Sequence, residues 1–203
     1  MANYPVITIS RQYGSGGREI GRLLSEMLNI PYYDNELITL AAEQSGFSPE
    51  LFKNADKNAS NSLLFSLSMY GSASTGSYNM PLGDQVFVIQ SDIIKKVASQ
   101  GPCIIVGRCA DYTLRDREDC LSVFLNAPLE VRIKHAIESY GVDPLKARDI
   151  IQKTDKKRAV YYSHFTGNKW GGSDHYHLTI DTARVGIEQT AKAIAAIAEN
   201  IRK

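Results

Sequence analysis

The stretch that decides the fold reads TISRQYGSGGREIGRLL, from Thr8 to Leu24. The β-branched run Val6 to Ile9 leads into it and predicts a buried strand over about 5–10. After a glycine-rich turn, apolar residues recur at spacings of three and four, which predicts a helix over about 17–28. The apolar stripe of that helix consists of Ile20, Leu23, Leu24, Met27 and Leu28.

The turn between strand and helix has the composition of a phosphate-binding loop. Glycines let the backbone curl so that several N–H groups converge on one anion, and the helix adds the positive end of its dipole. The common pattern GxxxxGK[ST] places Arg11 at its first glycine, Gly17 at its lysine and Arg18 at its Ser/Thr. A tight turn without a ligand is the alternative. The residues expected to bind phosphate or ATP here are Arg11, Gly14, Ser15, Gly16, Gly17, Arg18 and Glu19.

The rest of the chain alternates between strand and helix patterns. Strands are predicted over about 30–33, 103–107, 121–127 and 176–182, and helices over about 35–45, 84–100, 129–140, 144–164 and 186–202. Such alternation predicts an α/β fold, with a parallel five-stranded sheet covered by helices on both faces. Ligands of these sheets bind beyond the carboxyl ends of the strands.

Length and composition predict one ordinary globular domain over residues 1–203. The formal net charge of +1 requires no nucleic-acid or membrane partner. Cys103, Cys109 and Cys120 form no CxxC pair, and the N-terminus has no signal-peptide pattern, so we expect reduced thiols and a cytoplasmic protein. The histidines form no metal-ligand pattern, so we expect no metal site built by the protein itself.

Residues 54–84 break the pattern, because they combine Asn, Ser and Gly with aromatic residues and methionines. One interpretation is a flexible insertion. The other is an acceptor-side region or a contact that forms a homodimer, since a run this apolar should pack on something.

Five segments in this order resemble the cytidylate kinase-like family, a branch of the P-loop nucleoside monophosphate kinases: SRQYGSGGREIG, GRCAD, APLEVRIKH, DKKRAVYYSHFTGNKWG and YHLTIDT. The resemblance implies a three-layer P-loop NTPase fold with a lid region over about 129–171 and acceptor-binding insertions. It also implies small-molecule nucleotide substrates, with ATP and Mg²⁺ as cofactors. The γ-phosphoryl group would pass to a nucleoside monophosphate, most closely a CMP- or dCMP-like acceptor.

The same resemblance implies roles for individual residues. The acceptor would be held by Asp34, Arg108, Asp155 and Arg158, and ATP would be approached from the lid by Arg132 and Lys134. The residues implied to act in catalysis are Arg18, Arg132 and Arg158.

Three positions depart from the family pattern. Two acceptor arginines fall on Leu40 and Ile151, and the loop lysine falls on Gly17. Two alternatives therefore stay open beside the nucleotide kinase. One is a non-catalytic module that binds or senses nucleotides, and the other is a kinase of a non-nucleotide metabolite.

Overall fold

A computed structural model describes residues 4–34 and 82–201 of the chain. The chain divides into two compact units, one formed by residues 1–34 and 95–203 and the other by residues 35–94. The predicted helix over 35–45 and most of the 54–84 segment lie outside the described residues. The organisation of residues 1–203 as one domain therefore stays a prediction.

The first unit is built on a five-stranded sheet in which every neighbouring pair is parallel, in the order β2-β3-β1-β4-β5. In the central strand, Ile9 lies opposite Val106 on one side and Val123 on the other. This confirms the predicted five-stranded parallel sheet. The strands are β1 (Val6–Arg11), β2 (Tyr32–Tyr33), β3 (Ile104–Val106), β4 (Cys120–Asn126) and β5 (Leu178–Asp181).

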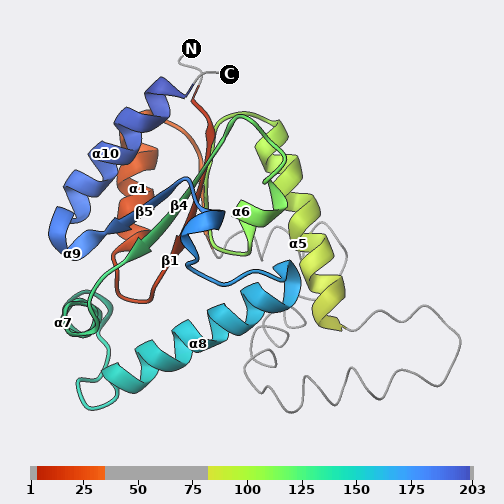
Figure 1. Cartoon of the computed structure of the whole chain (residues 1–203). Helices are drawn as coiled ribbons and strands as arrows, with labels where there is room; N and C mark the ends of the chain where they lie inside the picture. Colours follow the sequence, from red (N-terminus) through yellow and green to blue (C-terminus); the bar gives the residue numbers. More distant parts are fainter. Residues whose placement is uncertain (1–3, 35–81, 202–203) are drawn as a thin grey trace, which may run out of the picture. The chain divides into compact units, whose positions relative to one another are not determined.

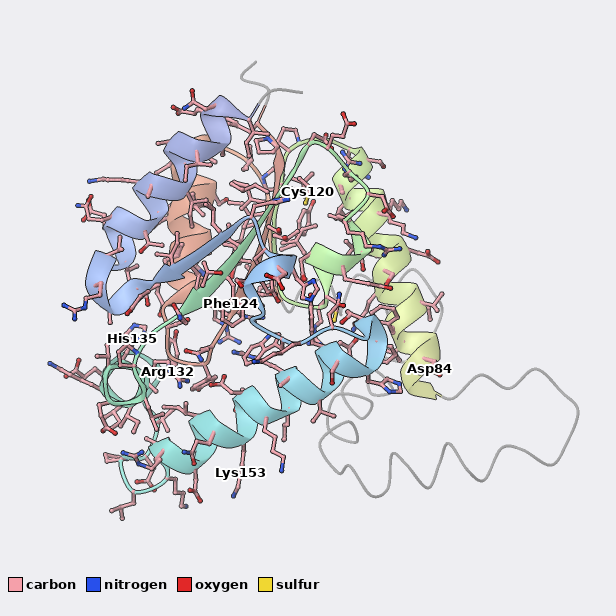
Figure 2. The ribbon with its side chains drawn as sticks, viewed as in Figure 1. Asp84, Cys120, Phe124, Arg132, His135 and Lys153 are labelled. Atoms are coloured by element: carbon pink, nitrogen blue, oxygen red, sulfur yellow. The ribbon has the colours of Figure 1, made fainter. Side chains whose placement is uncertain are left out.

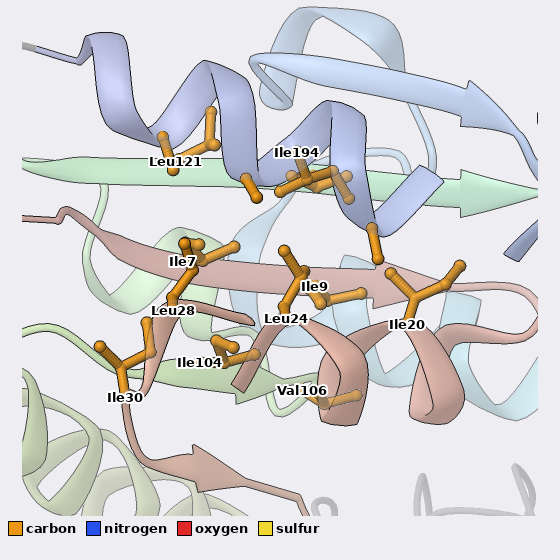
Figure 3. Packing of buried hydrophobic residues seen from close by; sticks show 14 of the residues in the cluster. Ile7, Ile9, Ile20, Leu24, Leu28, Ile30, Ile104, Val106, Leu121 and Ile194 are labelled. Atoms are coloured by element: carbon orange, nitrogen blue, oxygen red, sulfur yellow. The ribbon is translucent and has the colours of Figure 1, made fainter. Parts of the chain in front are cut away.

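Two helices, α1 (Gly17–Leu28) and α10 (Ile187–Asn200), pack on one face of the sheet (Figure 3). The stripe of α1 places Ile20 and Leu24 against Ile7 and Ile9 of β1, and Ile194 of α10 joins the same cluster. All five side chains are fully buried. The helix stripe and the strand alternation thus meet in one apolar core, as the sequence predicted.

The opposite face carries a short helix, α6 (Ala110–Thr113), which contacts β1 (Figure 1). Alternation along β1 turns Ser10 to this face, where its hydroxyl lies 3.3 Å from a carboxylate oxygen of Asp111. The prediction of helices on both faces is confirmed. The remaining elements are α5 (Leu82–Ser99), α7 (Leu129–Tyr140), α8 (Ala147–Thr166), the 3₁₀ turn η1 (Ser173–His175) and α9 (Thr182–Val185).

The differences from the predicted elements have local causes. Helix α8 begins at Ala147 because residues 143–146 form a turn, in which the Lys146 N–H donates to the Asp143 carbonyl (3.0 Å). Helix α9 was not predicted; it follows β5 directly and ends at Gly186, whose φ of +85° separates it from α10, the predicted last helix. Among the described helices, none has both the length and the apolar character that crossing a membrane requires.

Candidate phosphate-binding site

The loop between β1 and α1 needs its glycines for both conformation and space. Gly14 and Gly16 adopt φ values of +81° and +79°, a left-handed region that other residues rarely enter. A Cβ atom on Gly14 would lie 2.6 Å from the carbonyl oxygen of Arg132, and one on Gly16 would lie 2.9 Å from the side chain of Ile187. Helix α1 then starts at Gly17, so its first-turn N–H groups lie at the loop, as an anion cradle requires.

The loop is fastened to β4 by Ser15, which was predicted to lie at the phosphate, and by Gln12, which was not. The Ser15 hydroxyl donates to the Gln12 carbonyl (2.9 Å) and lies 3.4 Å from the Leu125 carbonyl. The backbone N–H of Gln12 donates to the Leu125 carbonyl oxygen (2.9 Å). The side-chain oxygen of Gln12 accepts a hydrogen bond from the Ala127 N–H (3.2 Å). Ser15 is buried, so its hydroxyl holds the shape of the loop.

Arginines gather where β1 ends. Arg11 lies 3.6 Å and Arg18 3.1 Å from the carboxylate of Asp34, which follows β2. Arg158 of α8 donates to the carbonyl oxygen of Arg11 (2.9 Å). Burial above all, and then repulsion from Arg158, Arg108 and Arg18, lower the pKa of Arg11 to about 9, although the attraction of Asp34 opposes this shift. The cluster therefore has more positive charge than its own carboxylates balance.

Asp155 of α8 and Arg132 of α7 connect these two helices to the loop. The Asp155 carboxylate accepts a hydrogen bond from the Tyr13 N–H (2.7 Å) and another from Arg132 (2.6 Å). Arg132 also donates to the carbonyl oxygens of Ala127 (2.9 Å) and Tyr13 (3.2 Å). Asp155 lies 3.9 Å from Arg158 as well. In this arrangement, both residues hold the loop, whereas the sequence placed Asp155 on the acceptor and Arg132 on ATP.

Glu19 faces α7 rather than the phosphate cradle. Its carboxylate accepts from the Tyr140 hydroxyl (3.1 Å) and lies 3.7 Å from His135. The other ring nitrogen of His135 lies 2.9 Å from the carbonyl oxygen of Gly14. Arg132 and His135 both project from α7 near the end of β4 (Figure 2). Lys134 lies apart from this group, since it is 74% exposed and pairs with Glu138.

The turn after β3 positions Arg108. Gly107, Arg108 and Cys109 all have positive φ values, of 82°, 60° and 54°. Two consecutive non-glycine residues in this region store backbone strain, which is often found at functional sites. The strained turn places Arg108 near Arg11, where each charge acts on the other.

Tyr13, His135 and Asp111 are site residues that the sequence did not single out. Asp111 is buried beneath the cluster, where it accepts hydrogen bonds from Ser10 (3.3 Å) and Tyr162 (2.6 Å). Burial raises its pKa, and the hydrogen bond from Tyr162 opposes that shift. The signal for Asp111 was a carboxylate shortly after a buried strand, in the GRCAD segment.

The carboxylates beside the loop are already bound by other side chains. Asp34 is shared by two arginines, and Glu19 is held by Tyr140 and His135. Within residues 4–34 and 82–201, no three His, Cys, Asp or Glu side chains are grouped to hold a metal ion. A Mg²⁺ ion bound beside this loop would have to take most of its ligands from phosphate oxygens and water.

Comparison with known proteins agrees with this geometry. The model of the cytidylate kinase-like family matches residues 6–184. A cytidylate kinase of Methanopyrus kandleri is 25% identical over 200 residues, which cover 94% of this chain and 91% of the relative. An uncharacterized protein from Eubacterium ventriosum has a similar structure, with a TM-score of 0.71 and 26% identity over 97% of this chain and 99% of that one.

More distant structures show the fold alone. A shikimate kinase from Acinetobacter baumannii aligns with a TM-score of 0.54 and 13% identity, over 99% of this chain and 97% of that one. The sheet order, the glycine loop after β1 and the family match over nearly the whole chain all lead to one assignment. The chain belongs to the cytidylate kinase-like family and has the fold of the P-loop kinases.

Proposed function

We propose that the protein transfers the γ-phosphoryl group of ATP to a nucleoside monophosphate, with a CMP- or dCMP-like acceptor. The observation that carries this proposal is the arginine cluster at the glycine loop. Four arginines act on one another there, and the carboxylate of Asp34 is shared by Arg11 and Arg18. A bound phosphate chain would supply the missing negative charge.

Phosphoryl transfer suits such a site because it requires little covalent chemistry from the protein. Its transition state spreads negative charge over the transferred group, and positioning with positive charge supplies most of the catalysis. In our proposal, the loop N–H groups hold the ATP phosphates, while Arg18 and Arg158 approach the transferred group. Mg²⁺, when bound with the nucleotide, would neutralise charge between its phosphates.

The acceptor side is assigned to the residues that follow β2 and β3. Asp34 and Arg108 lie beyond the carboxyl ends of these strands, where open α/β sheets bind ligands. Arg108 would bind the acceptor phosphate, and Asp34 would orient the arginines around it. Asp155 and Arg132 would keep the loop in place, since both bind its backbone.

One observation favours a second candidate, a kinase of a non-nucleotide metabolite. The family's acceptor arginine falls on Ile151, which is fully buried in α8 and offers no charge to an acceptor. Shikimate kinase shows that this fold also serves an acceptor without a base. The main alternative is therefore phosphoryl transfer from ATP to a non-nucleotide metabolite instead of a nucleoside monophosphate.

The experiment is ADP release from Mg-ATP with CMP, dCMP, UMP, AMP, GMP, shikimate or no acceptor. Release that depends on CMP or dCMP supports the first proposal, whereas release only with shikimate supports the second. The control is Gly16→Ala, because the added methyl group would strike Ile187 and distort the loop. Release that persists in this variant would come from a contaminating kinase. Protein that binds ATP but releases no ADP with any of the nucleotide acceptors would refute the first proposal, and no release with shikimate would exclude shikimate as the acceptor of the second.

A further inference from the structure

Two positions of the phosphate-loop pattern have exchanged their residue types. The pattern GxxxxGK begins with glycine and ends with lysine, whereas this chain has Arg11 at the first position and Gly17 at the last. A cation is thus absent from the start of the helix and present at the end of the preceding strand.

The structure brings these two positions into contact. A Cβ atom on Gly17 would lie 2.7 Å from Cγ and 2.9 Å from Cβ of Arg11. The aliphatic part of Arg11 therefore fills the space in which a side chain at position 17 would begin. A lysine at position 17 and the arginine at position 11 exclude each other.

The guanidinium of Arg11 extends from the loop toward the acceptor side. One terminal nitrogen lies directly against Gly107, after β3, where a Cβ atom would collide with it. The other lies 3.6 Å from Asp34, after β2. The side chain is 14% exposed. The Arg11 side chain therefore reaches from the start of α1 to the end of β3. It lies between the glycine loop and the residues proposed to bind the acceptor.

The electrostatic surroundings of Arg11 favour an anion. Arg158, Arg108 and Arg18 all repel it, and Asp34, the carboxylate that attracts it, also pairs with Arg18. A buried guanidinium with this much repulsion needs a further counter-charge. Phosphate oxygens suit it, because the planar guanidinium can bind two of them at once.

We propose that Arg11 replaces the missing loop lysine, so that the cation reaches the transferred phosphoryl group from β1 across Gly17. The inference rests on the proposed function, and within it Arg11 rather than Arg18 is the cation of the loop that contacts the transferred group. Arg18 is less suited to this role, because its side chain is 48% exposed and already pairs with Asp34 at 3.1 Å.

The test removes the cation at position 11 and restores a lysine at position 17, first singly and then together. Affinity for ADP and for adenosine is measured by calorimetric titration in wild type, Arg11→Ala, Gly17→Lys and the double variant Arg11→Ala/Gly17→Lys. Arg11→Ala should weaken ADP binding by about 10- to 100-fold, as expected for a lost charged hydrogen bond, without a comparable effect on adenosine. Gly17→Lys should be no better than wild type. The double variant should recover most of the lost affinity, because the lysine then has room.

Two further arginine variants serve as controls. Arg115→Ala removes an exposed arginine outside the cluster and should bind ADP like wild type. Arg18→Ala should weaken ADP binding less than Arg11→Ala does. A larger effect of Arg18→Ala would overturn the inference, as would a folded double variant that recovers no affinity.

The design separates this inference from the proposed function. Wild type that binds ADP through Arg11, yet releases no ADP from Mg-ATP with any of the nucleotide acceptors, refutes the nucleoside monophosphate kinase and supports the role of Arg11. A working kinase in which Arg11→Ala leaves ADP affinity and turnover unchanged refutes the role of Arg11 alone. Wild type that binds no ADP would overturn the inference, because no phosphate site would then exist.

Discussion

Replacing Arg11 with methionine should stabilise the protein in the absence of nucleotide. Methionine keeps an unbranched side chain of similar length but removes the charge. In the folded protein, burial and three neighbouring arginines lower the pKa of Arg11 from 12.5 to about 9, so folding disfavours its charged form. Because arginine stays protonated at neutral pH, that unfavourable energy is present throughout the working range. A neutral residue relieves it.

The magnitude follows from the pKa difference. The fall from 12.5 to about 9 is 12.5 − 9 = 3.5 pH units, equivalent to about 5 kcal/mol at about 1.4 kcal/mol per unit. Methionine loses the ion pair of the guanidinium with Asp34 and some of its packing, which reduces the gain. We therefore expect the free energy of unfolding to rise by about 2 kcal/mol in Arg11→Met.

Urea unfolding at neutral pH, without nucleotide or phosphate, measures this change. Arg11→Met should unfold at a higher urea concentration than wild type with the same slope, while Arg115→Met at an exposed position should not shift. Saturating ADP should then stabilise wild type much more than Arg11→Met, because only wild type keeps the guanidinium that would bind phosphate. Unfolding of Arg11→Met at a lower urea concentration than wild type would refute the reasoning.

Three other perturbations test separate parts of the structure. In steady-state kinetics, Arg108→Ala should raise KM for the acceptor more than KM for ATP, and equal increases would contradict its place on the acceptor side. Ile194→Ala should lower the free energy of unfolding by about 2–5 kcal/mol, because this residue is fully buried; Ile197→Ala on the same helix, 38% exposed, should cost less than about 1 kcal/mol. Burial raises the pKa of Cys103 from 9.0 to about 12, so its thiol ionises first in the unfolded chain and stability falls as pH rises from 9 toward 12. Cys103→Ala should remove about 1.4 kcal/mol of the loss between about pH 8 and pH 10, and an unchanged loss in urea titrations would count against this origin.

Much of the fold could be predicted because its signals are local. The run from Val6 to Ile9 and the stripe of α1 lie within a few residues of the glycine turn, so one window of sequence predicts strand, loop and helix together. Helix α6 escaped prediction because its four residues are too few to show a period. Helix α9 escaped prediction for the same reason, because it also has only four residues.

The site was predicted as a set of residue types rather than as a set of contacts. Glycines at 14 and 16 and cations at strand ends could be recognised without coordinates, because a phosphate cradle demands them. The sequence could not predict which residue each charged side chain would pair with. Asp155 meets the Tyr13 N–H across 142 residues of chain, and no local pattern encodes such a pairing.

The sequence by itself determined that this chain would form a parallel sheet with a glycine loop after its first strand, and that the loop would lack a lysine. Only the tertiary structure decided that Arg11 fills the space beside Gly17. The periods of helix and strand arise from each residue's own neighbours, whereas the packing of β1 against α1 depends on the whole core. For the same reason, the sequence could identify the missing cation but could not identify the side chain that occupies its place.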